Sequence, residues 1–250
     1  MFSKLILLRH GESKWNLENR FTGWTDVNLT ENGKIEAKKA GMLLLREGID
    51  INAVYVSYLK RAKNTSKICL KQLNCDNFKV VYDWRLNERH YGNLQGLNKK
   101  ETAKKYGDEQ VLIWRRSYDT PPPPLNEDDK RHPKYDLLYK DLNVDQLPNS
   151  ESLKDTLKRV KPLWVNQILP QLKIGKNIFI VAHGNSLRAI VKMLKKISNK
   201  DIVKLNIPTG CPYVFEFNQK FELIDDRYLG GSDEVSKKAA IVANQGLNKP

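Results

Sequence analysis

The stretch LILLRHGESKWN, residues 5 to 16, opens with four apolar residues and then turns abruptly polar around His10. A similar arrangement, NIFIVAHGNSLR, occupies residues 177 to 188, where an apolar run ends at His183 and is again followed by glycine. A short continuous apolar run bounded by turn residues is typical of a strand buried on both faces of a parallel sheet. Both stretches therefore predict a strand that ends at a His-Gly pair.

Strands and helices alternate along the rest of the chain. Thr30 is a predicted N-cap and Gly48 a predicted helix end, because they flank apolar residues at helical spacing. The remaining patterns predict strands at residues 53–59, 78–84, 212–218 and near 221–229, and helices at 31–48, 61–73, about 99–118, 150–172 (capped at Ser150 or Ser152) and 186–197. This alternation predicts an α/β fold with a mostly parallel central sheet and helices on both faces.

The chain has 250 residues, which is enough for one sizeable α/β domain or two small ones. Four successive prolines in TPPPPL, residues 120–125, exclude helix and sheet there. We expect about residues 95–150 to form an inserted helical and loop segment, because no flexible linker isolates them on both sides. A small-residue, partly helical tail is expected at about 232–250. The chain is thus predicted to be a single domain over residues 1–250.

Lys and Arg exceed Asp and Glu by 43 to 29, which gives a net charge of +14. Such an excess attracts polyanions or small anionic substrates. The lysines are spread along the chain, without a basic tail or the interleaved aromatic residues of single-strand binders. A non-catalytic nucleic-acid-binding protein stays open as an alternative, but no nucleic-acid partner is expected.

The three cysteines, Cys69, Cys75 and Cys211, have no CxxC spacing and no paired histidines nearby. They indicate neither a zinc site nor a disulfide framework, and we interpret them as core or surface thiols. The N-terminal apolar stretch is too short for a signal peptide, and no segment is long enough to span a membrane. We therefore expect a cytoplasmic protein without a membrane partner.

In an open α/β sheet, ligands bind beyond the carboxyl ends of the strands. If the strands before His10 and His183 are neighbours, both imidazoles point into one crevice. We expect the glycines that follow them to remove a Cβ that would keep a ligand from the backbone. One histidine after a strand is more often structural, but two strand-His-Gly units favour a catalytic pair.

Phosphoryl transfer fits these residue types. A neutral imidazole can form a covalent intermediate, and the phosphoryl oxygens need cations and hydrogen-bond donors around them. Arg9 adjoins His10, and Arg61 follows another predicted strand, although Arg61 taken alone would be interpreted as a surface cation. Ser13 and Asn16 lie in the turn after the first His-Gly, where hydroxyl, amide and backbone N–H groups can line an anion site.

Six motifs in order carry a resemblance to a known family. The chain resembles the cofactor-dependent phosphoglycerate mutases, members of the histidine phosphatase superfamily, from about Lys4 to Gly246. RHG alone is shared by many phosphatases, whereas the ordered set of long motifs is specific. The motifs are RHGESKWN (9–16), NRFTGWTD (19–26), LNERHYGNLQGLNK (86–99), WRRSYDTPPPP (114–124), AHGNSLRA (182–189) and LNIPTG (205–210).

The resemblance assigns three catalytic roles. It implies that His10 is the phosphorylated nucleophile, that His183 donates to the transferring phosphoryl group, and that Glu88 is the acid and base for the substrate hydroxyl. Considered by itself, Glu88 is equally consistent with the commoner role of a loop ion-pair partner. Arg9 and Arg61 match the phosphate-pocket positions of the family.

The substrate contacts also follow from the resemblance. Arg115 and Arg116 alone fit an exposed helix face, but a substrate with a carboxylate and a phosphate needs further cations. The implied substrate-binding residues are Ser13, Asn16, Thr22, Gly23, Tyr91, Lys99, Arg115, Arg116, Gly184 and Asn185.

The resemblance implies interconversion of 3-phosphoglycerate and 2-phosphoglycerate in glycolysis and gluconeogenesis, starting from a phospho-His10 enzyme. 2,3-Bisphosphoglycerate is the implied primer that phosphorylates His10, and no metal is implied. The implied partners are a small anionic phosphorylated substrate and further copies of the chain in a homo-oligomer, a dimer or a tetramer. A bisphosphoglycerate mutase or a broad-specificity histidine phosphatase is the alternative built on the same two histidines.

Two departures from the family pattern stand out. Asn93 lies where family members often carry a small residue, and the end of the chain, ANQGLNKP, lacks the paired terminal lysines of some relatives. In the family this tail closes over the active site. The departure therefore bears on closure and on the balance of mutase, synthase and phosphatase activities.

Overall fold

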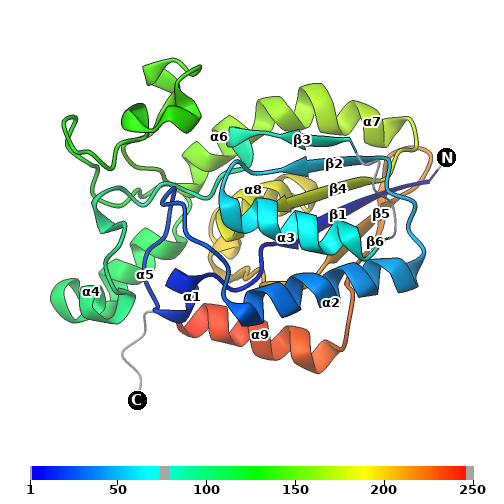
Figure 1. Cartoon of the computed structure of the whole chain (residues 1–250), viewed down its shortest axis with the longest axis horizontal. Helices are drawn as coiled ribbons and strands as arrows, with labels where there is room; N and C mark the ends of the chain where they lie inside the picture. Colours follow the sequence, from blue (N-terminus) through cyan, green and yellow to red (C-terminus); the bar gives the residue numbers. More distant parts are fainter. Residues whose placement is uncertain (1, 74–78, 246–250) are drawn as a thin grey trace.

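The computed structural model describes residues 2–73 and 79–245, which form an α/β structure around one six-stranded sheet (Figure 1). β1 pairs parallel with β4, β4 with β2 and β2 with β3, whereas β5 and β6 are antiparallel additions beside β1. The predicted mostly parallel sheet is therefore confirmed. In spatial order the strands are β3 (Val80–Tyr82), β2 (Ala53–Val56), β4 (Ile178–Ala182), β1 (Ser3–Arg9), β5 (Tyr213–Phe217) and β6 (Leu223–Tyr228).

The middle of β1, residues 5 to 8, is apolar because both faces of the strand are covered there. Leu5 and Leu7 pack into the core under one face of the sheet, and Ile6 and Leu8 pack into the core under the other. Successive side chains of a strand point to opposite faces, so a strand buried on both sides reads as a continuous apolar run. The apolar run of residues 5 to 8 therefore lies at the centre of the sheet, between β4 and β5.

Helices cover both faces of the sheet, as predicted (Figure 1). α2 and α3 pack on the face that holds Ile6, and α6, α7 and α8 pack on the face that holds Leu5. The helices are α1 (Lys14–Leu17), α2 (Glu31–Glu47), α3 (Lys60–Lys71), α4 (Lys99–Tyr106), α5 (Asp108–Arg116), α6 (Leu153–Leu163), α7 (Leu169–Lys173), α8 (Gly184–Leu194) and α9 (Ser232–Asn244).

Capping residues determine where several of the helices begin and end. The Thr30 hydroxyl accepts a hydrogen bond from Gly33 N–H at the start of α2, and Gly48 ends that helix with φ of 64°. Ser152, not Ser150, caps α6, and a π-helical segment, Trp164–Ile168, joins α6 to α7. The single helix expected from about residue 99 is divided into α4 and α5 by Gly107, whose φ is 87°. A residue with positive φ cannot continue an α-helix, and glycine takes that conformation without steric cost.

The parallel strands point their carboxyl ends toward α4, α5 and the segment of residues 120–150 (Figure 1). That segment contains only short 3-10 turns: Pro133–Tyr135, Leu137–Tyr139 and Val144–Gln146. α9 lies beside α2, to which Lys39 and Glu234 join it by an ion pair 2.5 Å long. The expected inserted segment therefore lies beyond the carboxyl ends of the parallel strands, and the tail helix α9 lies beside α2.

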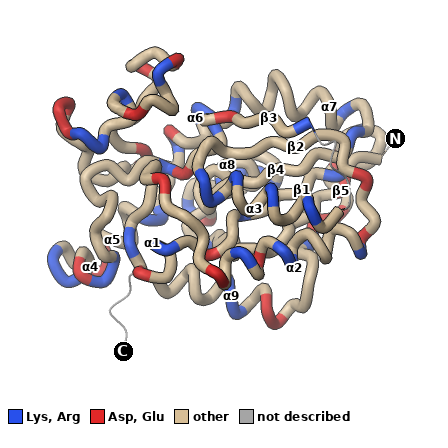
Figure 2. Tube along the Cα trace, in the orientation of Figure 1, with Lys and Arg blue, Asp and Glu red and all other residues tan. Residues whose placement is uncertain are grey.

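Cys69 and Cys211 are buried free thiols, and Cys75 lies outside the described residues. Lys and Arg are dispersed over most elements, with Asp and Glu among them (Figure 2). None of the described helices is both long and apolar enough to cross a membrane.

Candidate active site

The two His-Gly pairs lie side by side at the carboxyl ends of β1 and β4. Arg9 pairs with Ala182 in the parallel register, and His10 N–H donates to the Ala182 carbonyl at 3.1 Å. The imidazole rings of His10 and His183 are thereby 4.9 Å apart between centroids, at 57° between planes. Two histidines far apart in the sequence thus share one site because their strands are neighbours.

The hydrogen bonds of His10 identify which ring nitrogen carries the proton. Its Nδ1 lies 2.7 Å from the Gly11 carbonyl oxygen, which is only an acceptor, so Nδ1 carries the proton. Nε2 is then the lone-pair nitrogen, and Arg61 Nε–H donates to it at 3.3 Å. Burial and, after it, the charges of Arg61 and Arg9 hold the pKa of His10 well below its usual value. The imidazole is therefore neutral at neutral pH, with a lone pair on Nε2.

His183 is fully buried behind this position. Its Nε2 lies 2.7 Å from Ser57 Oγ, and its Nδ1 has no hydrogen-bond partner among the described residues. Burial, then Arg61 and His10, hold its pKa well below the usual value.

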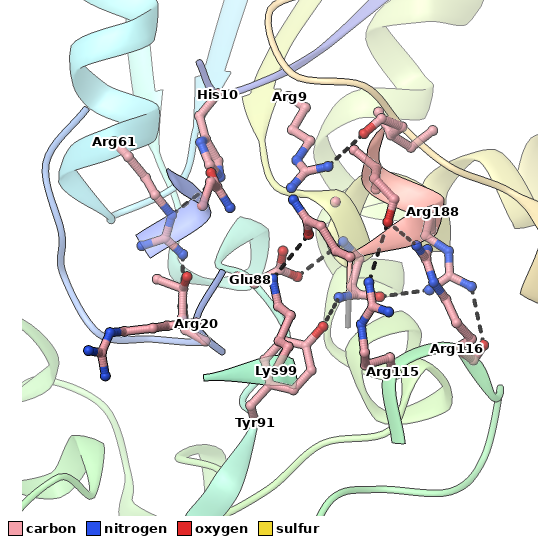
Figure 3. Close-up of a pocket in the computed structure, with 18 residues that line it drawn as sticks. Arg9, His10, Arg20, Arg61, Glu88, Tyr91, Lys99, Arg115, Arg116 and Arg188 are labelled. Atoms are coloured by element: carbon pink, nitrogen blue, oxygen red, sulfur yellow. Dashed lines mark hydrogen bonds between the residues drawn. The ribbon is translucent and has the colours of Figure 1, made fainter. Parts of the chain in front are cut away.

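A pocket opens in front of His10 (Figure 3). Arg9 and His10 enter it from one side, Lys99 and Tyr91 enter from the other, and Glu88 lies between them (Figure 3). All the predicted site residues line it except Ser13 and His183. The predicted residues that do so are Arg9, His10, Asn16, Thr22, Gly23, Arg61, Glu88, Tyr91, Lys99, Arg115, Arg116, Gly184 and Asn185.

Buried cations dominate the pocket. Within the described ranges, no carboxylate forms an ion pair with the pocket cations Arg9, Arg61, Lys99, Arg115, Arg116 or Arg188. Backbone carbonyls hold several of them instead: Arg9 donates to Ile207 O at 2.8 Å, and Arg61 donates to Gly23 O at 2.8 Å.

The pKa values of these cations reflect their burial and mutual repulsion. Burial is the largest cause and lowers the pKa of Arg61 and of Arg115 to about 10. Burial, followed by the neighbouring Arg115, holds the pKa of Lys99 well below its usual value. Burying charges of one sign without partners costs free energy, and a bound anion would offset that cost. These buried cations therefore form a site suited to an anion.

Glu88 is the one carboxylate in the pocket lining of the described structure. Its Oε1 accepts hydrogen bonds from two backbone N–H groups, that of Arg89 at 2.8 Å and that of Asn185 at 3.0 Å. A Cβ added at Gly184 would lie 3.6 Å from Glu88 Oε2 and 3.6 Å from Arg9 Cζ. Glu88 Oε2 thus faces the pocket beside Arg9, while Oε1 anchors the side chain.

Ser13 supports Asn16 from behind the pocket. The Ser13 hydroxyl donates to Asn16 Oδ1 at 2.9 Å, and Ser13 N–H donates to the same oxygen at 3.1 Å. Because Oδ1 is occupied in this way, Asn16 has only its Nδ2 donors to offer an anion. Ser13 therefore orients a pocket residue without lining the pocket itself.

The expectation that both glycines leave room for a ligand stays a prediction at Gly184 and is wrong at Gly11. Gly184 lines the pocket, where a Cβ would meet Arg9 and Glu88 at ordinary contact distance. At Gly11, by contrast, a Cβ would lie 2.1 Å from the Gly33 carbonyl oxygen. Gly11 is required because the loop after β1 packs against the start of α2, not because a ligand approaches it.

Five lining residues were not predicted. Arg188 belongs to α8, whose N-terminus lies at the site, and it donates to Asn185 Oδ1 at 2.8 Å. Arg188 lies four residues after Gly184, and this helical spacing is the signal that could have identified it. Two others come from α9 and the residue after it, and they lacked any local signal. The five are Arg20, Arg188, Ile207, Val242 and Gln245.

The described ranges hold no group of three or more His, Cys, Asp or Glu side chains that could bind a metal ion.

Comparison with known proteins identifies the family. The model of the histidine phosphatase superfamily (branch 1) matches residues 5–132 and 124–226. A protein of Bacteroides thetaiotaomicron, named 2,3-bisphosphoglycerate-dependent phosphoglycerate mutase 2, is 55% identical over 246 residues, which are 98% of this chain and 99% of that protein. A 2,3-bisphosphoglycerate-dependent phosphoglycerate mutase of Elusimicrobium minutum is 54% identical over the same shares of the two chains.

Solved structures support the fold. Mycobacterial hydrolase 1 matches with a TM-score of 0.69 at 20% identity, over 93% of this chain and all of that one. YhfR of Bacillus stearothermophilus matches with a TM-score of 0.65 at 24% identity, over 89% of this chain and 94% of that one. With the site geometry and the full-length relatives, the chain belongs to the 2,3-bisphosphoglycerate-dependent phosphoglycerate mutases of the histidine phosphatase superfamily.

Proposed function

We propose that this chain interconverts 3-phosphoglycerate and 2-phosphoglycerate through a phosphohistidine at His10. The observation that carries the proposal is a neutral His10 with Nε2 unprotonated, in a pocket whose buried cations lack carboxylate partners. An uncharged nucleophile can approach an anionic phosphoryl group, and the surrounding guanidinium groups stabilise the charge that the transfer spreads over the oxygens.

The residues divide the task by position. His10 Nε2 is the proposed nucleophile, and Arg9, Arg61 and Asn16 are proposed to bind the phosphoryl oxygens. The N-terminus of α8, at Gly184 and Asn185, adds the positive end of an eleven-residue helix. Glu88 Oε2 is proposed to accept the proton of the attacking hydroxyl and to return it to the leaving oxygen.

The remaining lining residues suit the rest of the substrate. Lys99, Arg115 and Arg116 are proposed to bind its carboxylate and second phosphate, with Tyr91, Asn185, Thr22 and Gly23 as further contacts. Arg9 Nε and Arg188 Nε are buried without partners among the described residues, as donors waiting for an anion would be. This donor set fits 2,3-bisphosphoglycerate, which when bound supplies the phosphoryl group that primes His10.

A coupled assay tests the function. Formation of 2-phosphoglycerate from 3-phosphoglycerate should require priming with 2,3-bisphosphoglycerate. If bisphosphate is hydrolysed while no 2-phosphoglycerate forms, the chain is a phosphatase. If the bisphosphate accumulates as the main product, the chain is a bisphosphoglycerate mutase.

The nucleophile is tested with His10→Ala. Radiolabelled 2,3-bisphosphoglycerate should leave an acid-labile, base-stable adduct on the wild type and none on the variant. The variant should keep the wild-type circular dichroism spectrum, because His10 lines the pocket and is not part of the two hydrophobic clusters that cover the sheet. An adduct that persists on His10→Ala would assign the nucleophile elsewhere.

The net charge of +14 does not favour a nucleic-acid-binding function. Basic and acidic residues are interspersed along the chain (Figure 2), and the cluster of cations in the pocket is buried. We expect no tight binding of duplex DNA at physiological salt, measured by fluorescence anisotropy. Tight binding that weakens steeply with salt would support the nucleic-acid alternative.

We also propose a single domain over residues 1–250, a homo-oligomer and a cytoplasmic location, all three supported by the family. Light scattering on the purified chain tests the homo-oligomer, since a monomeric mass would exclude it. Limited proteolysis tests the domain proposal, which separate stable fragments would contradict.

A further inference from the structure

We propose that Ser57 and Asn87 are positioning residues that keep the ring proton of His183 on Nε2, so that His183 meets a phosphoryl group through Nδ1 and donates to it only as an imidazolium. This inference rests on the proposed function, because it specifies the state in which the second histidine assists phosphoryl transfer. It follows from a chain of hydrogen bonds whose directions are fixed one after another.

The chain of bonds begins at a backbone group. Tyr58 N–H, which can only donate, lies 3.1 Å from Asn87 Oδ1. This contact fixes the orientation of the Asn87 amide, since a flipped amide would place two donors against each other. Asn87 Nδ2 then donates to the Tyr139 hydroxyl oxygen at 2.9 Å.

The direction of the Ser57 hydroxyl follows. Ser57 Oγ lies 2.9 Å from Asn87 Oδ1, and because that oxygen has no proton, the serine must donate its own. Leu59 N–H also donates to Ser57 Oγ, at 3.2 Å. With its single proton committed, Ser57 Oγ can only accept from His183 Nε2, which lies 2.7 Å away. The neutral ring of His183 therefore carries its proton on Nε2.

The consequence lies at the other nitrogen. His183 Nδ1 is buried, has no partner among the described residues, and in the neutral ring is a lone pair. His10 has the opposite tautomer, with its proton on Nδ1 and its lone pair on Nε2. A lone pair repels an anionic oxygen, so His183 can hydrogen-bond a phosphoryl oxygen through Nδ1 only after that nitrogen binds a second proton.

The groups around His183 oppose that second proton until an anion is present. The charged and titratable groups that act most strongly on it are Arg61 from α3, His10 and Arg9 from the end of β1, and Arg159 from α6. All four disfavour an imidazolium, as burial also does. An anion that binds beside these cations changes the balance, so phosphoryl binding and protonation of His183 are coupled. Ser57 and Asn87 cause this coupling by excluding the Nδ1–H tautomer.

The first experiment measures the tautomer. Nitrogen-15 NMR of the full chain with labelled histidine should show His183 protonated at Nε2 and not at Nδ1. Ser57→Ala should lose this exclusive tautomer, Ser57→Thr should keep it, and Ser66→Ala, which alters another buried serine, should leave it unchanged. Protonation at Nδ1 in the free wild type, or an unchanged tautomer in Ser57→Ala, would overturn the proposal.

The second experiment measures how the tautomer of His183 affects phosphoryl transfer. In the wild type the rate of phosphoenzyme formation from 2,3-bisphosphoglycerate should fall as pH rises, because the imidazolium is lost. Ser57→Ala should lower kcat about 10-fold with little change in KM, because losing one hydrogen bond to a group that assists the transfer costs about that factor in rate. Its alkaline decline should also be shallower, because the neutral Nδ1–H form can then donate.

A pH profile of Ser57→Ala with the wild-type shape would contradict the proposal, since a purely structural loss lowers the rate equally at every pH. Failure of this inference is separable from failure of the proposed function. A wrong tautomer with normal mutase activity refutes only the role of Ser57 and Asn87, whereas an absent mutase reaction refutes the function.

Discussion

Glu88 presents two unlike oxygens to its surroundings, and this difference makes its role testable. Oε1 is held by the Arg89 and Asn185 backbone N–H groups, so Glu88→Gln can keep those bonds through its amide oxygen. Proton transfer at the other atom is lost. We expect kcat for the mutase reaction to fall about 10²-fold to 10⁴-fold with KM changed little, measured in the coupled assay. A wild-type kcat in Glu88→Gln would exclude the acid and base role.

At this same scale, the residues that could be predicted were those with a local sequence signal. His10 and His183 follow apolar strands and are each followed by glycine, a pattern visible in a single stretch. The tautomers were not predictable, because they depend on Ser57 and Asn87, which lie far from His183 in the sequence. Gln245 was likewise missed, since its contact with Lys99 Nζ at 3.0 Å depends on where α9 packs.

The junctions between strands and helices contain the two glycines of the His-Gly pairs, and these differ in kind. Gly11→Ala would place a Cβ 2.1 Å from the backbone oxygen of Gly33, and neither backbone segment can move easily. We expect this variant to lose more than about 4 kcal/mol of unfolding free energy or to fail to fold. The Cβ of Gly184→Ala would have its nearest contacts at 3.6 to 3.7 Å, so the variant should fold normally and lose mutase activity because the pocket is narrower.

Urea unfolding and the coupled assay on both variants check this contrast. Gly48→Ala is the matched control, because nothing lies within 4 Å of its added Cβ and only its φ of +64° opposes the change. It should cost about 1 kcal/mol. A stable, active Gly11→Ala variant would show that the close approach to Gly33 is dispensable.

α9 is fastened to the body of the protein through Lys238. Lys238 Nζ lies 2.9 Å from Glu36 Oε1 and 3.5 Å from Glu234 Oε1, and Glu36 Oε2 accepts from Glu12 N–H in the loop after β1. Lys238→Met should loosen α9 by about 1 kcal/mol, a factor of about 5 in its opening. Since Val242 and Gln245 line the pocket, KM for 3-phosphoglycerate and proteolysis within α9 should both rise.

Lys237→Met is the control for this prediction, because Lys237 is exposed one position earlier in the same helix. It should leave KM and proteolysis unchanged. Equal effects of the two substitutions would mean that lost charge, and not the contact with Glu36, governs the helix.

The elements themselves were predicted more completely than their joins. The pattern of apolar residues predicted every strand of the sheet and the long helices. Each buried position requires an apolar residue, so the pattern is visible in the sequence itself. It did not predict the break between α4 and α5, because the lone Gly107 within a helical pattern has no distinguishing neighbour. The π-helical segment after α6 was also missed. Trp164 and Ile168 of this segment pack in the core under the sheet, and such long-range packing is not visible in the local pattern.

For the molecule as a whole, buried neutral histidines predict sensitivity to acid. Burial lowers the pKa of His90 from 6.5 to about 3, and His10 and His183 are also lowered. Below pH 6.5 the unfolded chain binds protons that the folded chain excludes, so stability is fully present above that pH and falls as the pH drops. Each such histidine contributes a slope of about 1.4 kcal/mol per pH unit.

His90 allows this slope to be measured away from the pocket. Its Nδ1 accepts from Gly92 N–H at 3.1 Å, and His90→Asn keeps an acceptor at that position. Between pH 6 and 4, urea unfolding of the variant should lose about 1.4 kcal/mol per pH unit less than the wild type. Parallel pH dependences of the two proteins would show that His90 is protonated in the folded state.

The position of β1 in the sheet has a consequence for synthesis. Its hydrogen-bonded neighbours are β4 and β5, which come from residues 178–182 and 213–217. A ribosome-bound chain therefore carries the apolar run Leu5–Leu8 with both edges of its strand unpaired until most of the polypeptide has emerged, an interval in which chaperone binding and aggregation compete. An incomplete translation product ending before residue 178 would have neither neighbour of β1 nor the second histidine, and would be both insoluble and inert.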